Sequence, residues 1–224
     1  MFIGHFAVGF AAKRWAPSTS LATLMLAPLL ADVLWPVLVL AGVEKVRIVP
    51  GFTAMNALAL DDFPWSHSLL MDLVWAALLG ALVARGAGGR RAGVVVGIGV
   101  VSHWVLDWIT HAPDMPLWPG GPEFGLALWN SVPGTMIVES LMFAVGVWLY
   151  LGATRATDRM GAVALWALVA LLVISYAAQP FMGTPPSVRA VVVSGLIFEA
   201  VSLAWLWWLD RHRRPSALAH GPVL

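Results

Sequence analysis

The sequence contains no cysteine and few charged residues. The absence of cysteine excludes disulfide bonds, thiolate metal sites, a cysteine nucleophile and covalently attached c-type haem. Charged residues make up 11% of the 224 positions, whereas a soluble domain usually has about 25%. Hydrophobic residues make up 60%, and the mean hydropathy is +0.83. This composition predicts an integral membrane protein.

Two further absences narrow the function. Thirteen basic and twelve acidic residues leave a net charge of +1, so the chain has no broad basic surface and we expect no nucleic-acid partner. The sequence also lacks the HExxH motif of zincin-type proteases, the GxSxG motif of serine hydrolases and a phosphate-binding P-loop. The chemistry of those classes is therefore not expected.

Apolar segments divide the chain and predict its fold. A span of about 20 apolar residues crosses the hydrocarbon core of a bilayer, and spans without a barrel pattern must be helices. A shorter apolar segment, 2–16, is just long enough to span if it is helical. We therefore predict an all-α integral membrane protein, a compact bundle of about seven transmembrane helices in a single domain over residues 1–224. The six long segments are 18–42, 66–84, 92–111, 134–152, 160–178 and 188–209.

Lysine and arginine in the short loops predict the orientation. Most of them fall on one side of the predicted topology, which the positive-inside rule makes cytoplasmic. The protein is then a multi-pass protein of the cytoplasmic (inner) membrane, with a basic cytoplasmic tail over 210–224. Lys45 and Arg47 fall on the other side, where Glu44, Asp61 and Asp62 offset them. The cytoplasmic residues are Lys13, Arg14, Arg85, Arg90, Arg91, Arg155, Arg159, Arg211, Arg213 and Arg214.

Ionisable residues within the spans indicate a functional site. The segment SHWVLDWITH places His103, Asp107 and His111 at i, i+4 and i+8, almost one above another with a rise of about 6 Å per step. Charged or ionisable groups inside a membrane are costly and usually face the protein interior.

Four more such residues fall at the same depth, towards the extracytoplasmic side. They come from four other parts of the chain: His5, Asp32, His67 and Glu139. Imidazole and carboxylate together suit Zn²⁺ best, and also Mn²⁺ or Fe²⁺. We therefore predict a site for one or two divalent transition-metal ions, with ligands His5, Asp32, His67, His103, Asp107 and His111.

Each residue also has a structural interpretation. His103 and Asp107 could form a hydrogen-bonded pair that ties helices together. His67 could cap its helix together with Ser66, and Asp32 could orient a helix break before Pro36. His5 and His111 could be solvated histidines at span ends. We interpret Asp72 as a support of the site or a helix bridge, and Glu199 as a helix bridge to Arg189.

Several short motifs resemble a known family. They are GH at 4–5, PLLADVLWP at 28–36, WSHSLL at 65–70, SHWVLDWIT at 102–110 and PLWP at 116–119. Together they resemble the bacterial inner-membrane proteins described as metal-dependent hydrolases, of the LexA-regulated type. The resemblance covers roughly the first 120 residues. It implies that the functional residues are His5, Asp32, His67, His103, Asp107 and Thr110.

The sequence departs from that family's pattern at several positions. Leu34 stands where the family has a second aspartate, Asp62-Phe63-Pro64 replaces a His-Arg-Gly, and His111 is additional. The ligand order also resembles zinc-dependent phospholipase C and the S1-type nucleases. Those enzymes continue with a His-x-x-x-Glu, where this chain has Thr135 and Glu139, so a third metal is not expected.

These observations predict a membrane hydrolase. Asp107 is a candidate bridge between two metals, Glu139 and Asp62 are candidate general bases, and the 112–133 loop is a candidate extracytoplasmic lid over the site. By analogy with the soluble enzymes the reaction is phosphoester cleavage on a membrane lipid or lipid-linked substrate.

Two alternatives stay open. One is amide hydrolysis in the manner of the seven-helix ceramidases. The other is a non-enzymatic metal carrier, proton-coupled transporter or assembly factor. A transporter needs polar residues that reach both faces of the membrane, and here the inner halves of the spans are almost wholly apolar.

Overall fold

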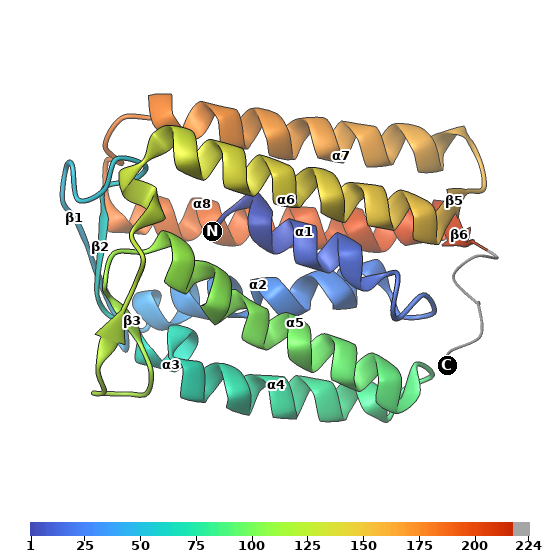
Figure 1. The fold of residues 1–224 in the computed structure, drawn as a ribbon, viewed down its shortest axis with the longest axis horizontal. Coiled ribbons are helices and arrows are strands. Elements are labelled where there is room, and N and C mark those ends of the chain that lie inside the picture. The colour runs from blue at the N-terminus through green and yellow to red at the C-terminus, as the bar shows by residue number, and fades with distance from the viewer. Residues whose placement is uncertain (217–224) are drawn as a thin grey trace.

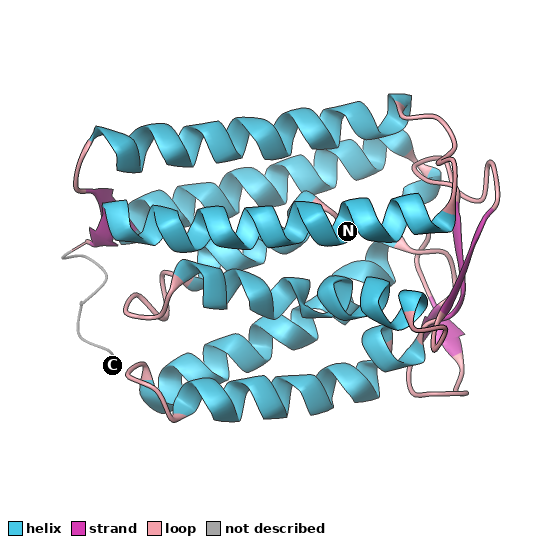
Figure 2. Ribbon diagram, turned by 180° about the vertical axis from the view of Figure 1, so that it is seen from behind, coloured by secondary structure: helices cyan, strands magenta, loops and turns pink. Residues whose placement is uncertain are grey.

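The computed structural model describes residues 1–216, which form eight α-helices and three short sheets (Figures 1 and 2). The helices are α1 Ile3–Ala12, α2 Leu21–Leu40, α3 Pro64–His67, α4 Leu69–Ala84, α5 Gly89–Thr110, α6 Val132–Ala153, α7 Arg159–Ala178 and α8 Val188–Leu209. Single 3₁₀ turns lie at η1 Leu128–Asn130, η2 Gln179–Phe181 and η3 Asp210–His212.

Five helices are long and apolar enough to cross a membrane. These are α2, α5, α6, α7 with η2, and α8 with η3. The other apolar helices, α1 and α4, are shorter. At 1.5 Å per residue the 10 residues of α1 extend about 15 Å, half of a hydrocarbon core of about 30 Å. The first residues of α1 lie part-way along the bundle (Figure 1). The expectation that segment 2–16 just spans as a helix is therefore not met, because the helix ends at Ala12.

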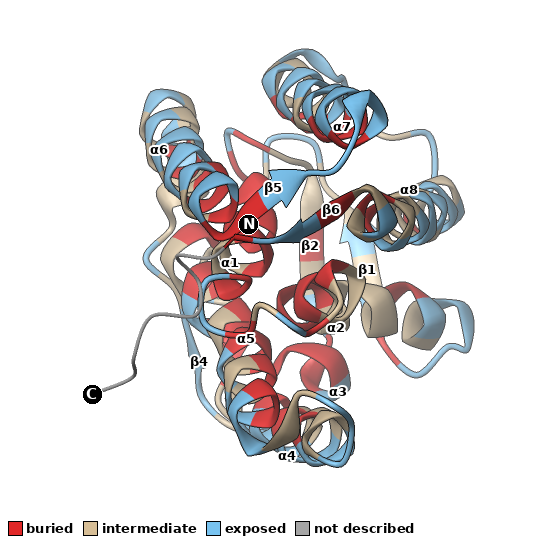
Figure 3. Cartoon of the chain, turned by 90° about the vertical axis from the view of Figure 1, so that its right-hand side faces the viewer, coloured by how far each residue is buried: buried red, intermediate tan, exposed pale blue. Residues whose placement is uncertain are grey.

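The outer surface of the bundle is apolar. Large side chains on the outward faces of the helices are more than half exposed, whereas the inward faces are buried (Figure 3). A contiguous apolar surface of this kind would promote aggregation in water, whereas it is suited to contact with lipid. Examples are Leu78, Leu82, Ile98, Trp148, Ile174 and Ile197.

Short sheets, which the all-helical prediction missed, close both ends of the bundle. The antiparallel pairs are β1 Lys45–Ile48 with β2 Leu58–Asp62, β3 Met115–Pro116 with β4 Glu123–Phe124, and β5 Thr154–Ala156 with β6 Arg213–Pro215. The first two pairs lie at one end and the third at the other (Figure 1). Strands can form there because backbone groups outside the hydrocarbon can bond to water, so they need not be satisfied within a helix.

The predicted basic loops gather at the β5–β6 end. There the Lys13 ammonium lies 2.9 Å from Asp210 Oδ1, and Arg213 donates to Thr154. At the opposite end, Arg47 Nε lies 2.6 Å from Asp61 Oδ2, and Lys45 Nζ lies 4.0 Å from Asp62 Oδ2. The two basic residues that opposed the predicted orientation are thus neutralised by local partners.

Helix α1 lies inside the bundle and is held there by close packing. Phe6 and Phe10 are buried in the main apolar core with Phe143 of α6. A Cβ atom at Gly146 of α6 would lie 2.6 Å from the Ala7 Cα, so only glycine lets α6 approach α1 this closely. This packing sets the position of the residues at the start of α1, including His5.

Candidate metal centre

His103, Asp107 and His111, which the sequence predicts to lie along one face of a helix, form a stripe on α5 in which Asp107 contacts both histidines. Asp107 Oδ2 lies 3.2 Å from His103 Nε2 and 3.3 Å from His111 Nε2. All three side chains are buried. His111 caps the C-terminus of α5 with an extended backbone, and its ring still turns back towards Asp107. Helix periodicity therefore brings the three groups together as predicted.

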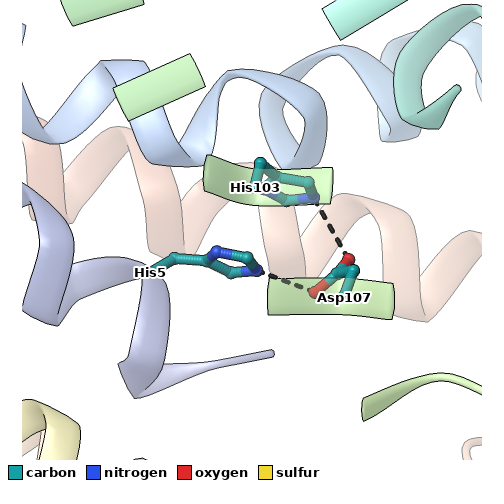
Figure 4. A group of neighbouring side chains, drawn as sticks. All are labelled: His5, His103 and Asp107. Atoms are coloured by element: carbon teal, nitrogen blue, oxygen red, sulfur yellow. Dashed lines mark hydrogen bonds and ion pairs between the residues drawn. The ribbon is translucent and has the colours of Figure 1, made fainter. Parts of the chain in front are cut away.

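His5 approaches the same carboxylate from α1. Its Nε2 lies 3.0 Å from Asp107 Oδ1, and its ring stacks on His103 with centroids 4.1 Å apart and planes 7° apart (Figure 4). The amino group of Met1 also contacts Asp107 Oδ1. The two oxygens of Asp107 therefore face different partners, Oδ1 towards α1 and Oδ2 towards the other histidines.

Asp32 and His67 complete the cluster from α2 and α3. His67 Nε2 lies 3.6 Å from Asp32 Oδ1 and 3.9 Å from Asp107 Oδ2. His103 Nε2 lies 4.0 Å from Asp32 Oδ1. Pro36 follows Asp32 by four residues within α2, so it has no N–H to donate to the Asp32 carbonyl and interrupts the helix there. The six predicted ligands thus meet in one place.

The donor set fits a divalent transition metal. Bonds of about 2.0–2.1 Å to nitrogen or oxygen place the ligand atoms of a tetrahedral zinc site about 3.3 Å apart. The separations of Asp107 Oδ2 from His103 and His111, 3.2 and 3.3 Å, match this value. The separations of His67 Nε2 from Asp32 and Asp107 are longer, at 3.6 and 3.9 Å. Imidazole and carboxylate are also the ligands that such ions prefer.

Two overlapping groups of ligand atoms can be distinguished. His5, His103 and Asp107 form one group, and Asp32, His67 and His103 form the other, each within 4.8 Å. His103 belongs to both, yet only its Nε2 can bind a metal, because Nδ1 lies 2.7 Å from the Pro28 carbonyl oxygen and donates to it. A second ion would therefore have to share Asp107, whose carboxylate has two faces.

His67 is oriented by a relay of side chains. Its Nδ1 lies 2.7 Å from Ser66 Oγ, which in turn lies 2.6 Å from Glu44 Oε2. Glu44 also accepts hydrogen bonds from the backbone N–H groups of Trp65 and Ser66. Because the Ser66 hydroxyl donates to Glu44, it accepts from His67 Nδ1–H, which leaves the His67 Nε2 lone pair facing the cluster. Burial raises the pKa of the Glu44 carboxyl, and the hydrogen bonds from Ser66 and Trp65 oppose that rise.

His111 has an acidic partner of its own. Its Nδ1 lies 3.1 Å from Asp114 Oδ1, so the ring presents Nε2 to Asp107. Oxygen partners behind the ring, here a carboxylate, a carbonyl and a serine hydroxyl, orient most histidines that bind metals in proteins. Three of the four histidines here, His67, His103 and His111, have such an oxygen partner behind the ring.

The two residues predicted as general bases have their hydrogen bonds and ion pairs with groups outside the ligand set. Glu139 Oε2 accepts hydrogen bonds from Phe2 N at 2.8 Å and Gly4 N at 3.1 Å, so it satisfies free N–H groups at the start of α1. Asp62 lies at the end of β2, where its side chain is half exposed and pairs with Lys45. Glu139 therefore positions His5, and Asp62 has no bond to the cluster.

Other buried polar residues were interpreted differently from the sequence. Asp72 is buried on α4, and neither of its carboxylate oxygens has a hydrogen-bond partner of good geometry within residues 1–216, so its role as a support of the site or a helix bridge stays a prediction. Glu199 forms no ion pair with Arg189 in the same region. Thr110 donates to the Leu106 and Asp107 carbonyls of its own helix. Sequence reasoning paired Ser66 with His67 only as a helix cap and missed Glu44 and Asp114; Asp114 stands three residues after His111, whereas Glu44 is 22 residues from Ser66 and no local spacing links the two.

A small cavity gives access to the cluster. Its volume is about 110 Å³, and Asp32, His67, Asp107 and His111 form its polar side. The 112–133 loop packs over this end of α5, since Ala127 N donates to the His111 carbonyl oxygen at 2.7 Å. The ring of Trp129 in η1 covers His111 with centroids 4.3 Å apart. The predicted lid segment thus lies against the cluster.

The chain was compared with known proteins. Searches of curated proteins and of solved structures gave no match. The family model for the YdjM inner membrane protein matches residues 1–182, well beyond the first 120 residues that carry the motifs. This match includes every residue of the cluster and the relay. The chain therefore belongs to the YdjM inner membrane protein family and is an inner-membrane protein.

Proposed function

We propose that this protein is an integral-membrane metal-dependent hydrolase that cleaves a phosphoester in a membrane lipid or lipid-linked substrate. The observation that carries the proposal is Asp107, a buried carboxylate that meets the Nε2 atoms of four histidines. Ionisable side chains inside a membrane cost free energy, and where they occur they usually belong to a functional site. Oxygen partners behind three of the rings favour binding of a cation at the remaining nitrogens.

The residues divide into three roles in this proposal. His5, His67, His103, His111 and Asp107 hold one or two ions, with Zn²⁺ the best fit and Mn²⁺ or Fe²⁺ as alternatives. A bound divalent metal lowers the pKa of water and polarises an ester oxygen. Asp32, whose side chain is 31% exposed and lines the cavity, can join these ligands through one oxygen and would be placed to take a proton from a water molecule on the other. Glu139 keeps α1 in place.

The arrangement favours an amphiphilic substrate and a single-sided site. The cluster lies towards the β1–β4 end, and Trp35 and Trp129 line its cavity. Between the cluster and the basic end the helices pack through apolar residues such as Leu24, Val96 and Val100. No polar path along the described residues resembles the two-sided pathway of a transporter.

Metal content and turnover test the proposal together. Purified protein should hold one or two equivalents of a transition metal, and a chelator should abolish cleavage that added Zn²⁺ or Mn²⁺ restores. His67→Ala and His103→Ala should each lower the metal content. His212→Ala is the matched control, because His212 pairs with Asp158 at the basic end.

The substrate panel separates the remaining alternatives. It contains phospholipids, lipid-linked phosphates, ceramides and soluble phosphodiesters, assayed in detergent with metal supplied. Cleavage of ceramides alone would favour amide hydrolysis. Bound metal without turnover on any compound would favour a metal carrier, a transporter or an assembly factor.

We also propose a membrane topology for the chain. Seven helices cross or enter the membrane as one domain, the cluster faces the extracytoplasmic side, and the C-terminus is cytoplasmic. Of the proposed tail 210–224, residues 217–224 lie outside the described part of the chain. Reporter fusions after Arg90 should be cytoplasmic and fusions after Gly120 extracytoplasmic, because the basic loops gather at one end. The reverse result would move the site to the inner face.

A further inference from the structure

One of the residues that line the access cavity carries a buried hydrogen-bond donor without a partner in the described part of the chain. Trp35 lines the cavity three residues after Asp32 on α2, and its Nε1 is buried without a partner among residues 1–216. An indole N–H can only donate. Buried donors nearly always have an acceptor, so a ligand atom in the cavity would complete this one.

Asn56 offers a second donor from the β1–β2 loop. Its side-chain Oδ1 accepts from Leu58 N at 3.0 Å, its backbone N donates to Thr53 Oγ1 at 3.0 Å, and its carbonyl accepts from Thr53 N at 3.1 Å. The Leu58 N–H fixes which end of the amide is oxygen. The Nδ2 group forms no hydrogen bond within residues 1–216, on a residue that these bonds hold in place and that lines the cavity.

The two residues that carry these donors line a cavity that Asp32, His67, Asp107 and His111 of the metal centre also line. A ligand that satisfies both N–H groups and a cation must present oxygen atoms in at least three directions. A tetrahedral phosphoryl group does so, whereas an amide carbonyl offers one oxygen and a carboxylate two. Hydrogen bonds to an anion are also stronger than those to a neutral group.

We infer that Trp35 Nε1 and Asn56 Nδ2 bind the oxygen atoms of a substrate phosphoryl group held against the metal centre. The inference rests on the proposed function for the metal and adds the two residues that recognise the anion. Ligand pockets that enclose a whole small molecule measure about 300–1,000 Å³, and this cavity measures about 110 Å³. Only the phosphoryl group therefore enters, and the rest of the substrate stays outside.

Inorganic phosphate is the probe that tests the two donors. Its dissociation constant is measured by calorimetry on the metal-loaded full chain, for the wild type, Trp35→Phe and Asn56→Ala. Each substitution removes one donor and should weaken phosphate binding about tenfold, the effect of one charge-assisted hydrogen bond. Metal content should stay unchanged, because neither residue belongs to the ligand set.

Matched controls make the result specific. Trp118→Phe and Asn130→Ala apply the same changes to exposed residues of the 112–133 loop outside the cavity lining, and both should bind phosphate as the wild type does. Metal-loaded variants that bind phosphate with wild-type affinity would overturn the donor assignment and leave the proposed hydrolase intact. A wild type that takes up no metal would overturn both.

A competition arm identifies the source of the phosphoryl group. Short-chain phosphatidic acid and glycerol phosphate are each titrated against bound inorganic phosphate. Stronger displacement by phosphatidic acid assigns the cavity to a lipid headgroup, whereas equal displacement by both assigns it to a soluble phosphate. Failure of both compounds to displace phosphate would contradict the inference.

Discussion

Replacing Asp107 with asparagine is expected to reduce bound metal to background and to eliminate turnover. The carboxylate is buried and meets all four histidine Nε2 atoms of the cluster. An amide has one oxygen instead of two and no charge, so it cannot neutralise a cation or bridge two ions. Its NH₂ group would also face an imidazole nitrogen that is arranged to bind metal. Metal content of the purified variant is the direct measurement.

The same substitution should change how stability responds to metal. An ion that binds only the folded protein stabilises it by about 2.7 kcal/mol when its free concentration is 100 times the dissociation constant. Wild-type protein should therefore melt at a lower temperature in a chelator, and Asp107→Asn should melt at the same temperature with or without it. Asp61→Asn, on an exposed aspartate paired with Arg47, is the control. Wild-type melting that ignores the chelator would leave only the hydrogen-bond interpretation of the cluster.

The stripe on α5 could be predicted because it depends on helix geometry alone. Residues four apart on one helix lie on one face, and the distances from Asp107 to His103 and His111 follow from that. Joining His5, Asp32 and His67 to the stripe needed two more facts. Hydropathy set their depth in the membrane, and the positions of lysine and arginine set the side.

The partners of Glu139 and Asp62, the two predicted general bases, could not be predicted in this way, and their part in catalysis stays a prediction. A buried glutamate near a span end has the same sequence pattern whether it caps a helix or moves a proton. Only its partner atoms distinguish the two, and Glu139 bonds to the N–H groups of Phe2 and Gly4. Asp62 was predicted to belong to the site because it stands shortly before His67 in the sequence. In the structure the β1–β2 pairing places it opposite Lys45 at the surface.

The length of α1 could not be predicted from the sequence either. Hydropathy treats 2–16 as one apolar segment, although the helix covers only Ile3–Ala12. A half-length helix inside a bundle is stable here because the polar groups at both of its ends have partners. Glu139 accepts from the N–H groups of Phe2 and Gly4, and the carbonyls of Ala11 and Ala12 accept from the backbone N–H groups of the turn that follows the helix. The result places an imidazole in the interior of the membrane protein, where a full span would carry it to the surface.

The relay behind His67 is the feature with the second-largest expected effect. Ser66→Ala removes the acceptor of His67 Nδ1–H and leaves Glu44 with only its backbone donors. Glu44→Gln replaces an acceptor oxygen with an NH₂ group, so the Ser66 hydroxyl can no longer donate there while it accepts from His67. Loss of such a supporting partner typically lowers metal affinity about 10- to 100-fold.

Competition with a chelator of known affinity measures that loss for Ser66→Ala and Glu44→Gln. Both variants should still fold, since the helix packing is untouched, and should regain wild-type occupancy at high metal concentration. Ser194→Ala and Glu123→Gln are the controls, because both residues are exposed and neither bonds to the cluster. Unchanged affinity in both relay variants would show that His67 is oriented by packing alone. An affinity loss in Ser66→Ala without one in Glu44→Gln would place the whole effect in the serine hydroxyl and leave Glu44 as a cap for the backbone of α3.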